Sequence, residues 1–163
     1  MIENLFFRIS RGLNYILNAK GKHGIHSPVL FNFLNLHLKN TLKNLDRNQR
    51  ILNALITCFK IQSVYMEKEI LLPDSIPVQL DHKNTADLVI VHSESFLDKE
   101  LMQTQKTQII AILGLNKNSS NLKSFIHLRK SKKVTFSLDM WTIGILICNY
   151  PSLKQDFILR NFF

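Results

Sequence analysis

Residues 108–148 read QIIAILGLNKNSSNLKSFIHLRKSKKVTFSLDMWTIGILIC and carry the clearest α/β pattern of the chain. Runs of branched residues predict strands at 108–113, 134–138 and 143–148. Apolar residues at helical intervals predict a helix over 119–130, between the first two of these strands. The last two strands leave no room for a helix between them. We therefore expect an antiparallel hairpin at the sheet edge, with its turn near residues 140–142.

The same alternation continues toward the N-terminus. Short branched runs predict further strands at 61–66, 77–80 and 88–91, and a helix is expected at 96–105. A last extended segment at 156–160 is expected to pair beside the hairpin. Strands that alternate with helices favour right-handed βαβ units, so we expect an α/β fold with a mostly parallel sheet over residues 61–163.

Residues 1–60 predict a helical region in front of this sheet. In the first twenty residues, apolar side chains recur at helical spacing: Ile2, Leu5, Phe6, Ile9, Leu13, Ile16 and Leu17. We expect this amphipathic helix to dock on the body of the protein and to stop around residues 21–24. The alternative is attachment to a membrane surface through residues 1–20, because a basic amphipathic helix can lie among lipid headgroups.

Two more helices are expected before the first strand. Ser27 is a candidate N-cap, and Pro28 suits the first helical position, where a missing N–H costs nothing. The buried stripe of this second helix should be Phe31, Leu34, Leu38 and Leu42. The third helix should span residues 47–59 and face inward through Ile51, Leu52, Leu55, Ile56 and Phe59.

Length and composition favour one compact domain over residues 1–163, since the chain is 45% hydrophobic and 20% charged. The formal net charge of +9 is uneven: it is +7 over residues 1–60, −4 over 61–114 and +6 over 115–163. Excess cations favour polyanionic partners such as nucleic acid. Solubility, in a chain rich in Lys and Asn, would also explain them.

Cysteine usage and the absence of an apolar span favour a cytoplasmic location. Cys58 and Cys148 lie inside apolar runs, where free cysteine behaves as a small hydrophobe, and this suits a reducing compartment. No apolar run approaches the roughly 18 residues that a membrane-spanning helix needs. The N-terminus also lacks the layout of a signal peptide, because Glu3, Arg8 and Arg11 interrupt it.

Three stretches point to a known family. Lys22-His23-Gly24-Ile25-His26-Ser27-Pro28 lies between a basic helix and an apolar one, and it resembles the N-terminal signature of a group of bacterial S-adenosylmethionine-dependent methyltransferases of class-I (Rossmann-like) fold. Residues 134–139 and 143–145, followed by 157–160, resemble the terminal hairpin and closing strand of that group. Residues 47–59, which lead into a strand at Ile61, resemble the helix before the group's first strand. Members of that group are longer, so the resemblance implies a reduced Rossmann-like fold.

The chain departs from this group where the resemblance implies the methyl-donor site. In that group, the first strand ends in an acidic residue and a glycine-rich turn that admits the cofactor. Glu67 stands at the acidic position, but residues 25–113 contain no glycine, and Lys68 and Ile70 bring Cβ atoms toward the ligand. An Asp-rich motif is replaced by His92-Ser93-Glu94, and an acidic pair is replaced by Gly114-Leu115-Asn116.

These departures lead to a non-catalytic hypothesis. We expect no catalytic residue and no cofactor. We also expect no metal site, because no cluster of Cys, Asp or Glu accompanies His23 and His26. The chain would then act as a methyltransferase-like binding or assembly factor on RNA or a protein complex. The alternative is an active S-adenosylmethionine-dependent methyltransferase with an atypical pocket.

Each hypothesis has its own candidate residues. If the protein is active, the candidates for binding the cofactor are Glu67, His92, Glu94 and Asn116. The candidates for partner binding are His23, His26, Arg8, Arg11, Lys20, Lys22, Arg129, Lys130, Lys132 and Lys133. If the basic residues near the N-terminus and those of 129–133 form one surface, a nucleic-acid backbone would be its natural ligand.

Overall fold

A computed structural model describes residues 2–19, 25, 27–38, 45–67, 79–80, 82–92 and 105–159. The helices are α1 (Ile2–Asn18), α2 (Pro28–Asn32), the π-helix η2 (Phe33–Leu38) that continues α2, α3 (Arg47–Phe59) and α4 (Ser119–Leu128). The strands are β1 (Ser63–Met66), β2 (Gln79–Leu80), β3 (Leu88–Val91), β4 (Gln108–Leu113), β5 (Val134–Asp139), β6 (Ile143–Cys148) and β7 (Gln155–Ile158).

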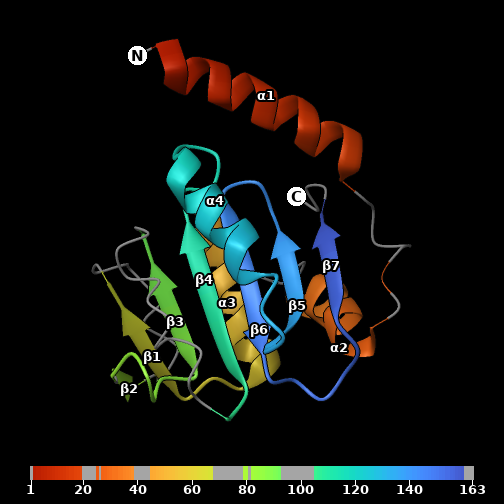
Figure 1. Cartoon of the computed structure of the whole chain (residues 1–163). Coiled ribbons are helices and arrows are strands. Elements are labelled where there is room, and N and C mark those ends of the chain that lie inside the picture. Colours follow the sequence, from red (N-terminus) through yellow and green to blue (C-terminus); the bar gives the residue numbers. More distant parts are fainter. Residues whose placement is uncertain are drawn as a thin grey trace.

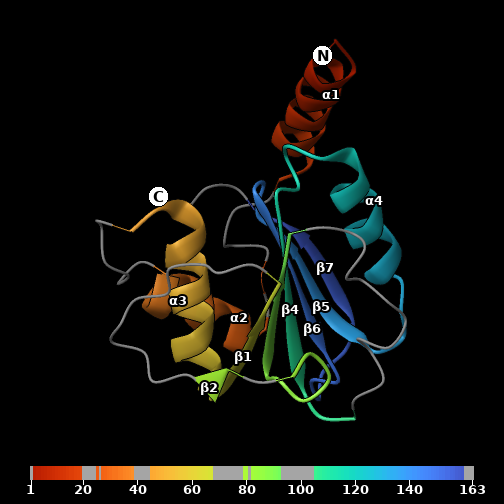
Figure 2. The same cartoon turned by 90° about the vertical axis from the view of Figure 1, so that its left-hand side faces the viewer.

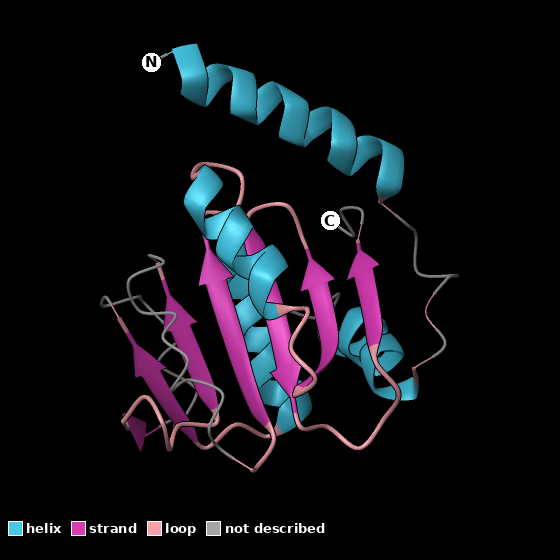
Figure 3. Cartoon of the chain, in the orientation of Figure 1, coloured by secondary structure: helices cyan, strands magenta, loops and turns pink. Residues whose placement is uncertain are grey.

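The strands form one sheet in the order β2-β1-β3-β4-β6-β5-β7. Every neighbouring pair is parallel except those that β6 makes with β4 and β5. The mostly parallel α/β sheet and its C-terminal antiparallel hairpin are therefore confirmed, and Figure 3 shows β6 running against its neighbours. The expected closing strand is present: β7 pairs beside the hairpin, next to β5, and forms the edge of the sheet, while β6 lies inside it.

Helices cover both faces of this sheet. Helices α2 and α3 lie on one face and α4 on the other, as Figures 1 and 2 show. The side chains of β6 alternate between the two layers: Ile143, Ile145 and Ile147 join the core under α3, whereas Leu146 and Cys148 join the core under α4. Both faces of β4, β5 and β6 are buried, which explains the nearly continuous apolar sequences of β4 and β6.

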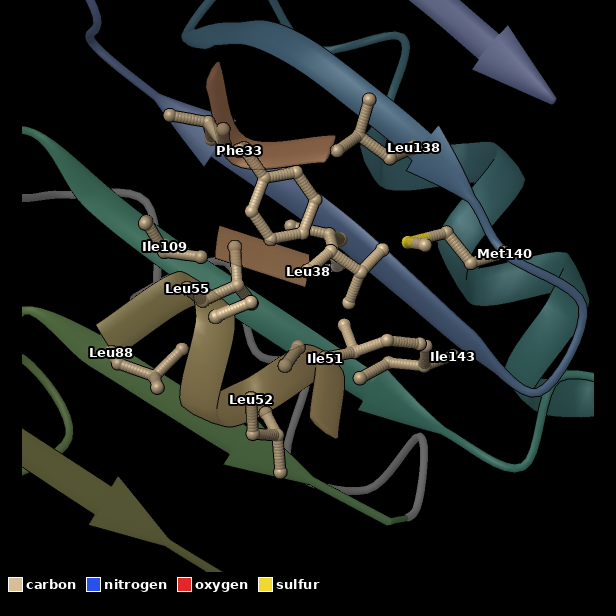
Figure 4. Close-up of a cluster of buried hydrophobic side chains, with 14 of the residues drawn as sticks. Phe33, Leu38, Ile51, Leu52, Leu55, Leu88, Ile109, Leu138, Met140 and Ile143 are labelled. Atoms are coloured by element: carbon tan, nitrogen blue, oxygen red, sulfur yellow. The ribbon is translucent and has the colours of Figure 1, made fainter. Parts of the chain in front are cut away.

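The larger core joins α3 and η2 to the sheet. Figure 4 shows Phe33 and Leu38 of η2 meeting Ile51, Leu52 and Leu55 of α3 over the strands. Helix α3 has the predicted bounds because both of its ends are capped. The Asp46 side chain accepts a hydrogen bond from the backbone N–H of Gln49, and the Gln49 side chain accepts one from the backbone N–H of Asp46. Lys60 ends the helix in the left-handed conformation, at φ 52°. Its predicted inward residues are buried, apart from the half-buried Phe59.

The second helix buries only part of the predicted stripe. Leu34 and Leu38 are buried as predicted, but Phe31 is 48% exposed and Leu42 lies outside the described residues. Leu30 and Phe33, which were not predicted, are fully buried. The wider π-helical turn from Phe33 onward changes which side chains share a face, and sequence periodicity does not register this change. Pro28 occupies the first turn as expected, but the Ser27 side chain makes no capping hydrogen bond.

Helix α1 docks on the body as predicted, but it does so through its polar side. It lies across the carboxyl ends of the strands, apart from both helical layers (Figures 1 and 2). Its polar side contacts the body through the buried Arg11 and Tyr15. The apolar side faces solvent, because Arg11 and Tyr15 find specific partners at this edge and so fix the rotation of the helix.

Most other predicted elements agree with the structure. Strands β3, β4 and β6 have the predicted bounds, while β1 begins at Ser63 and α4 ends at Leu128. Residues 96–104 of the helix expected at 96–105 lie outside the described residues, and so does Arg160 of the closing strand. None of the helices in the described ranges is long and apolar enough to cross a membrane.

Candidate functional site

The predicted cofactor candidates lie at the carboxyl edge of the sheet. Glu67 follows β1, His92 follows β3, and Asn116 follows β4 by three residues. Parallel strands end at the same edge, so the fold brings these positions to one side of the molecule as the sequence implied. Glu94 lies outside the described residues.

Glu67 is bound to the neighbouring strand end. Its backbone N–H donates to the Ile90 carbonyl at 3.0 Å. Its carboxylate accepts a hydrogen bond from the backbone N–H of His92. A charged acceptor on a backbone donor is among the stronger hydrogen bonds of a protein. The carboxylate therefore joins the ends of β1 and β3 and does not point free into solvent.

Asn121 closes the same edge farther along, and the sequence analysis missed it. Its Nδ2 donates to the carbonyls of His92 and Leu113, at 2.8 Å each, and so fixes the start of α4 to the ends of β3 and β4. Gly114 turns the chain at φ 75°, and a Cβ there would lie 3.5 Å from Asn121 Nδ2. The available signal was a polar residue within the apolar pattern of the helix predicted at 119–130.

At this edge, three buried polar atoms have no hydrogen-bond partner among the residues that the structure describes. They are His92 Nε2, Asn116 Oδ1 and Asn121 Oδ1. Asn116 and Asn121 are 8% and 2% exposed, so water does not freely solvate them. A buried polar atom without a partner costs roughly 1 to 3 kcal/mol. Together these atoms form the part of the edge that a polar ligand could still bind.

A second region of interest is the cleft between α1, α4 and the strands β5 and β7. It has a volume of about 300 Å³. Its lining combines apolar walls with charged groups: Phe7, Ser10, Arg11, Asn14, Leu122, Ile126, Arg129, Asp139 and Ile158. Such a mixture suits an amphipathic ligand or a docking partner better than a free metal ion.

An ion pair between Arg11 and Asp139 forms the floor of this cleft. Arg11 NH1 and NH2 donate to Asp139 Oδ2 and Oδ1 at 2.7 and 2.6 Å, in a bidentate geometry. The two side chains are 6% and 5% exposed. Asp139 also accepts from the backbone N–H of Trp141 at 3.1 Å. Arg11 was predicted as a candidate partner-binding cation, but its charge is neutralised inside the protein.

Aromatic rings surround the same ion pair. The Arg11 guanidinium carbon lies 5.7 Å from the centre of the Tyr15 ring and 5.5 Å from that of Trp141, within cation–π range. The Tyr15 hydroxyl donates to the Leu159 carbonyl. Burial raises the pKa of that hydroxyl despite the nearby Arg47 and Arg11, so it stays a neutral donor. Trp141, in the hairpin turn, packs against Tyr15, with the two ring centres 5.2 Å apart.

The other predicted basic residues are spread over the molecule. Arg8 is exposed on α1, and Arg129 lines the cleft, where no residue of the described part forms a hydrogen bond or ion pair with its guanidinium. Lys130, Lys132 and Lys133 lie just before β5, at the opposite edge of the sheet from α1. His23, His26, Lys20 and Lys22 lie outside the described residues, so their part in partner binding stays a prediction.

Of the eight large apolar side chains that are exposed in the described part of the chain, six lie on the solvent-facing side of α1. Six of its side chains are more than half exposed: Leu5 at 60%, Phe6 at 74%, Ile9 at 55%, Leu13 at 59%, Ile16 at 64% and Leu17 at 80%. We call this set the α1 apolar face. A contiguous exposed face of this kind marks an interaction surface.

Two further searches bear on function. Within the described ranges, no group of three or more His, Cys, Asp and Glu side chains could hold a metal ion. In comparisons with known proteins, no protein-family model, no curated protein and no solved structure matches the chain.

Proposed function

We propose that the protein is a methyltransferase-like binding or assembly factor with a reduced Rossmann-like domain, and that it does not bind a methyl donor. The observation that carries this proposal is the hydrogen bond between the Glu67 carboxylate and the His92 backbone N–H. Glu67 is the acidic residue available at the end of β1. A carboxylate held by the backbone N–H that follows β3 is poorly placed to recognise an adenosyl group.

The C-terminal part of the fold supports the methyltransferase-like half of the proposal. The hairpin of β5 and β6 and the strand β7 beside it occupy the places that the resemblance implied. The missing glycine turn supports the non-catalytic half, because side chains follow β1 where a backbone would have to approach the cofactor.

The α1 apolar face supports a binding role. Keeping six large apolar side chains in water is costly unless another surface covers them. The buried ion pair between Arg11 and Asp139 holds the helix with this face outward. An apolar surface favours a protein or lipid partner over RNA, because RNA is bound mainly through cations that meet its phosphates.

An active methyltransferase is the second candidate, and one observation favours it. His92 Nε2, Asn116 Oδ1 and Asn121 Oδ1 are buried without partners at the edge where open α/β sheets bind ligands. A polar group of a cofactor could bind them. This candidate requires that the donor bind beside β3 and β4 and not against the turn after β1.

Isothermal titration of the full chain with S-adenosylhomocysteine tests the proposal. We expect no saturable heat, since Glu67 is engaged and no glycine turn is present. Binding tighter than about 100 μM, which corresponds to roughly −5.5 kcal/mol, would overturn the proposal and support the second candidate. In that case Asn116→Ala should weaken the binding, whereas the distant exposed change Leu153→Ala should not.

A further inference from the structure

The α1 apolar face forms a ridge at one end of the molecule. Figures 1 and 2 show α1 beyond the carboxyl ends of the strands, with the body on its other side. The helix contacts that body through Arg11, Tyr15 and Gly12, the last of which lies against Trp141. The opposite side of the helix is therefore available to an outside surface from Leu5 to Leu17.

A second copy of the chain is a poor fit to this ridge. A standard interface uses roughly 800 Å² and about 20 to 30 residues on each side. The α1 apolar face offers six large side chains on one convex helix. A contact between two such ridges would be small, and it would leave the bodies of the two copies apart.

A lipid bilayer needs no complementary groove. An amphipathic helix can lie in the plane of the interface, with its apolar side in the boundary between headgroups and acyl chains. Phe6, Leu13 and Leu17 provide the large side chains that such insertion uses. Arg8 is exposed on the same helix, from where a long side chain can reach the lipid headgroups.

The charge of this end of the molecule suits an anionic membrane. Arg8 on α1 and Lys117 just after β4 are exposed at the carboxyl edge of the sheet, and Lys20 and Lys22 follow α1 in the sequence. Among the described carboxylates of this edge, Asp139 is neutralised by Arg11, whereas Asp46 and Glu67 keep their charge in hydrogen bonds with backbone N–H groups. Residues 1–60, which include α1, carry a net charge of +7, so the excess charge of this part of the chain is positive.

We infer that α1 is a membrane-surface anchor, which lies in the headgroup region of an anionic bilayer and keeps the sheet on the water side. The inference rests on the proposed function, because it names the partner of the binding surface. The ion pair between Arg11 and Asp139 sets the orientation, since it keeps the polar side of the helix on the protein and the apolar side toward lipid.

Co-sedimentation of the full chain with vesicles tests the inference. The vesicles contain about 30% phosphatidylglycerol in phosphatidylcholine, to supply negative charge. We expect saturable binding that high salt weakens. The double change Leu13→Glu and Leu17→Glu should lower the partition coefficient about tenfold or more, because it places charges on the inserted side. Leu153→Glu is the matched control, since Leu153 is 83% exposed but lies outside α1, and it should bind like the unchanged protein.

The remaining outcomes separate the alternatives. No vesicle binding, or binding that the double change leaves intact, would overturn the membrane inference. A dimer in sedimentation velocity that the double change dissolves, without vesicle binding, would assign the face to a second copy and also overturn it. Titration of the same preparation with S-adenosylhomocysteine tests the proposed function independently of vesicle binding. Saturable heat there contradicts the proposed function, whereas its absence together with failed vesicle binding contradicts the membrane inference alone.

Discussion

Arg11 and Asp139 are 128 positions apart in the chain and form a buried bidentate ion pair. The pair joins the middle of α1 to the last residue of β5, beside the hairpin turn. Buried ion pairs gain little net stability, because desolvation opposes the attraction, but they can specify one arrangement among several. Here the pair explains why α1 turns its apolar side away from the body.

Removing one partner of this pair should release α1. Arg11→Met leaves the Asp139 carboxylate buried without its cation, which typically costs about 3 kcal/mol. We expect most of this cost to appear as detachment of the helix, with the sheet still folded. Trp141, the single tryptophan, lies against Arg11 and Tyr15 and should shift its emission to longer wavelength. Arg8→Met is the exposed control, and an unchanged Trp141 spectrum in Arg11→Met would contradict this role.

Gly144 should tolerate no side chain. A Cβ at this position in β6 would lie 2.6 Å from a Phe125 ring carbon and 2.7 Å from a Leu115 methyl carbon. We expect Gly144→Ala to destabilise the fold by about 1 to 3 kcal/mol through overpacking between the sheet and α4. Chemical denaturation measures the loss.

Gly12 provides the matched control for that substitution. Among the described residues, the Cβ added at Gly12 would contact Trp141 alone, at 3.6 Å, which is an ordinary contact. Because Ala is the better helix former, Gly12→Ala should stabilise α1 by about 0.5 to 1 kcal/mol. Equal effects of the two substitutions would contradict the packing described for β6 and α4.

Asp87 should make stability depend on pH in the acid range. Burial raises the pKa of its carboxyl, but hydrogen bonds from Lys106 Nζ and from the Gln62 and Ser63 amides lower it further than burial raises it. Because the pKa of Asp87 in the folded state lies below the unfolded value near 3.8, the ionised carboxylate stabilises the folded state at pH values above that unfolded pKa. This contribution disappears as the pH falls through the lower pKa of the folded state.

The variant Asp87→Asn isolates this effect. At about pH 7 it should be less stable than the unchanged protein by roughly 1 to 2 kcal/mol, because charge-assisted hydrogen bonds are lost. The difference should shrink steadily in denaturation curves taken below about pH 4. A difference that stays constant down to about pH 2 would show that the charge of Asp87 contributes nothing.

The two cysteines should differ in reactivity. Burial raises the pKa of the Cys148 thiol to about 11, although Lys133 acts against it. Burial also raises the pKa of Cys58, which is partly exposed. At about pH 8 a disulfide reagent should modify Cys58 slowly and Cys148 only after unfolding. Fast modification of Cys148 in the folded Cys58→Ser variant would contradict the burial of Cys148.

The sequence predicted the sheet well because its signals are local. The branched runs at β3, β4 and β6 are bounded by polar residues, so their predicted bounds match the structure. Helix α3 was likewise predicted by its apolar spacing. The exposure of Phe31 was not predicted, because the spacing of apolar residues in the sequence does not reveal the π-helical turn that follows it.

The candidate site was harder to predict because it depends on distant contacts. Amphipathic spacing in α1 shows that one side is apolar, but it does not show which side meets the protein. That choice depends on Arg11 finding Asp139, and on Tyr15 finding the Leu159 carbonyl 144 positions away. The bridging role of Asn121 likewise appears only when β3 and β4 lie side by side.

The proposed binding role and the membrane inference both depend on the outward orientation of the α1 apolar face, and solvent accessibility measured by NMR tests that orientation most directly. A soluble gadolinium chelate, added to dilute lipid-free protein with labelled leucine methyls, broadens the signals of exposed groups. We predict strong broadening for Leu13 and Leu17, like that of Leu153, and none for the buried Leu30 and Leu55. Protection of Leu13 and Leu17 to the level of Leu55 would contradict this orientation.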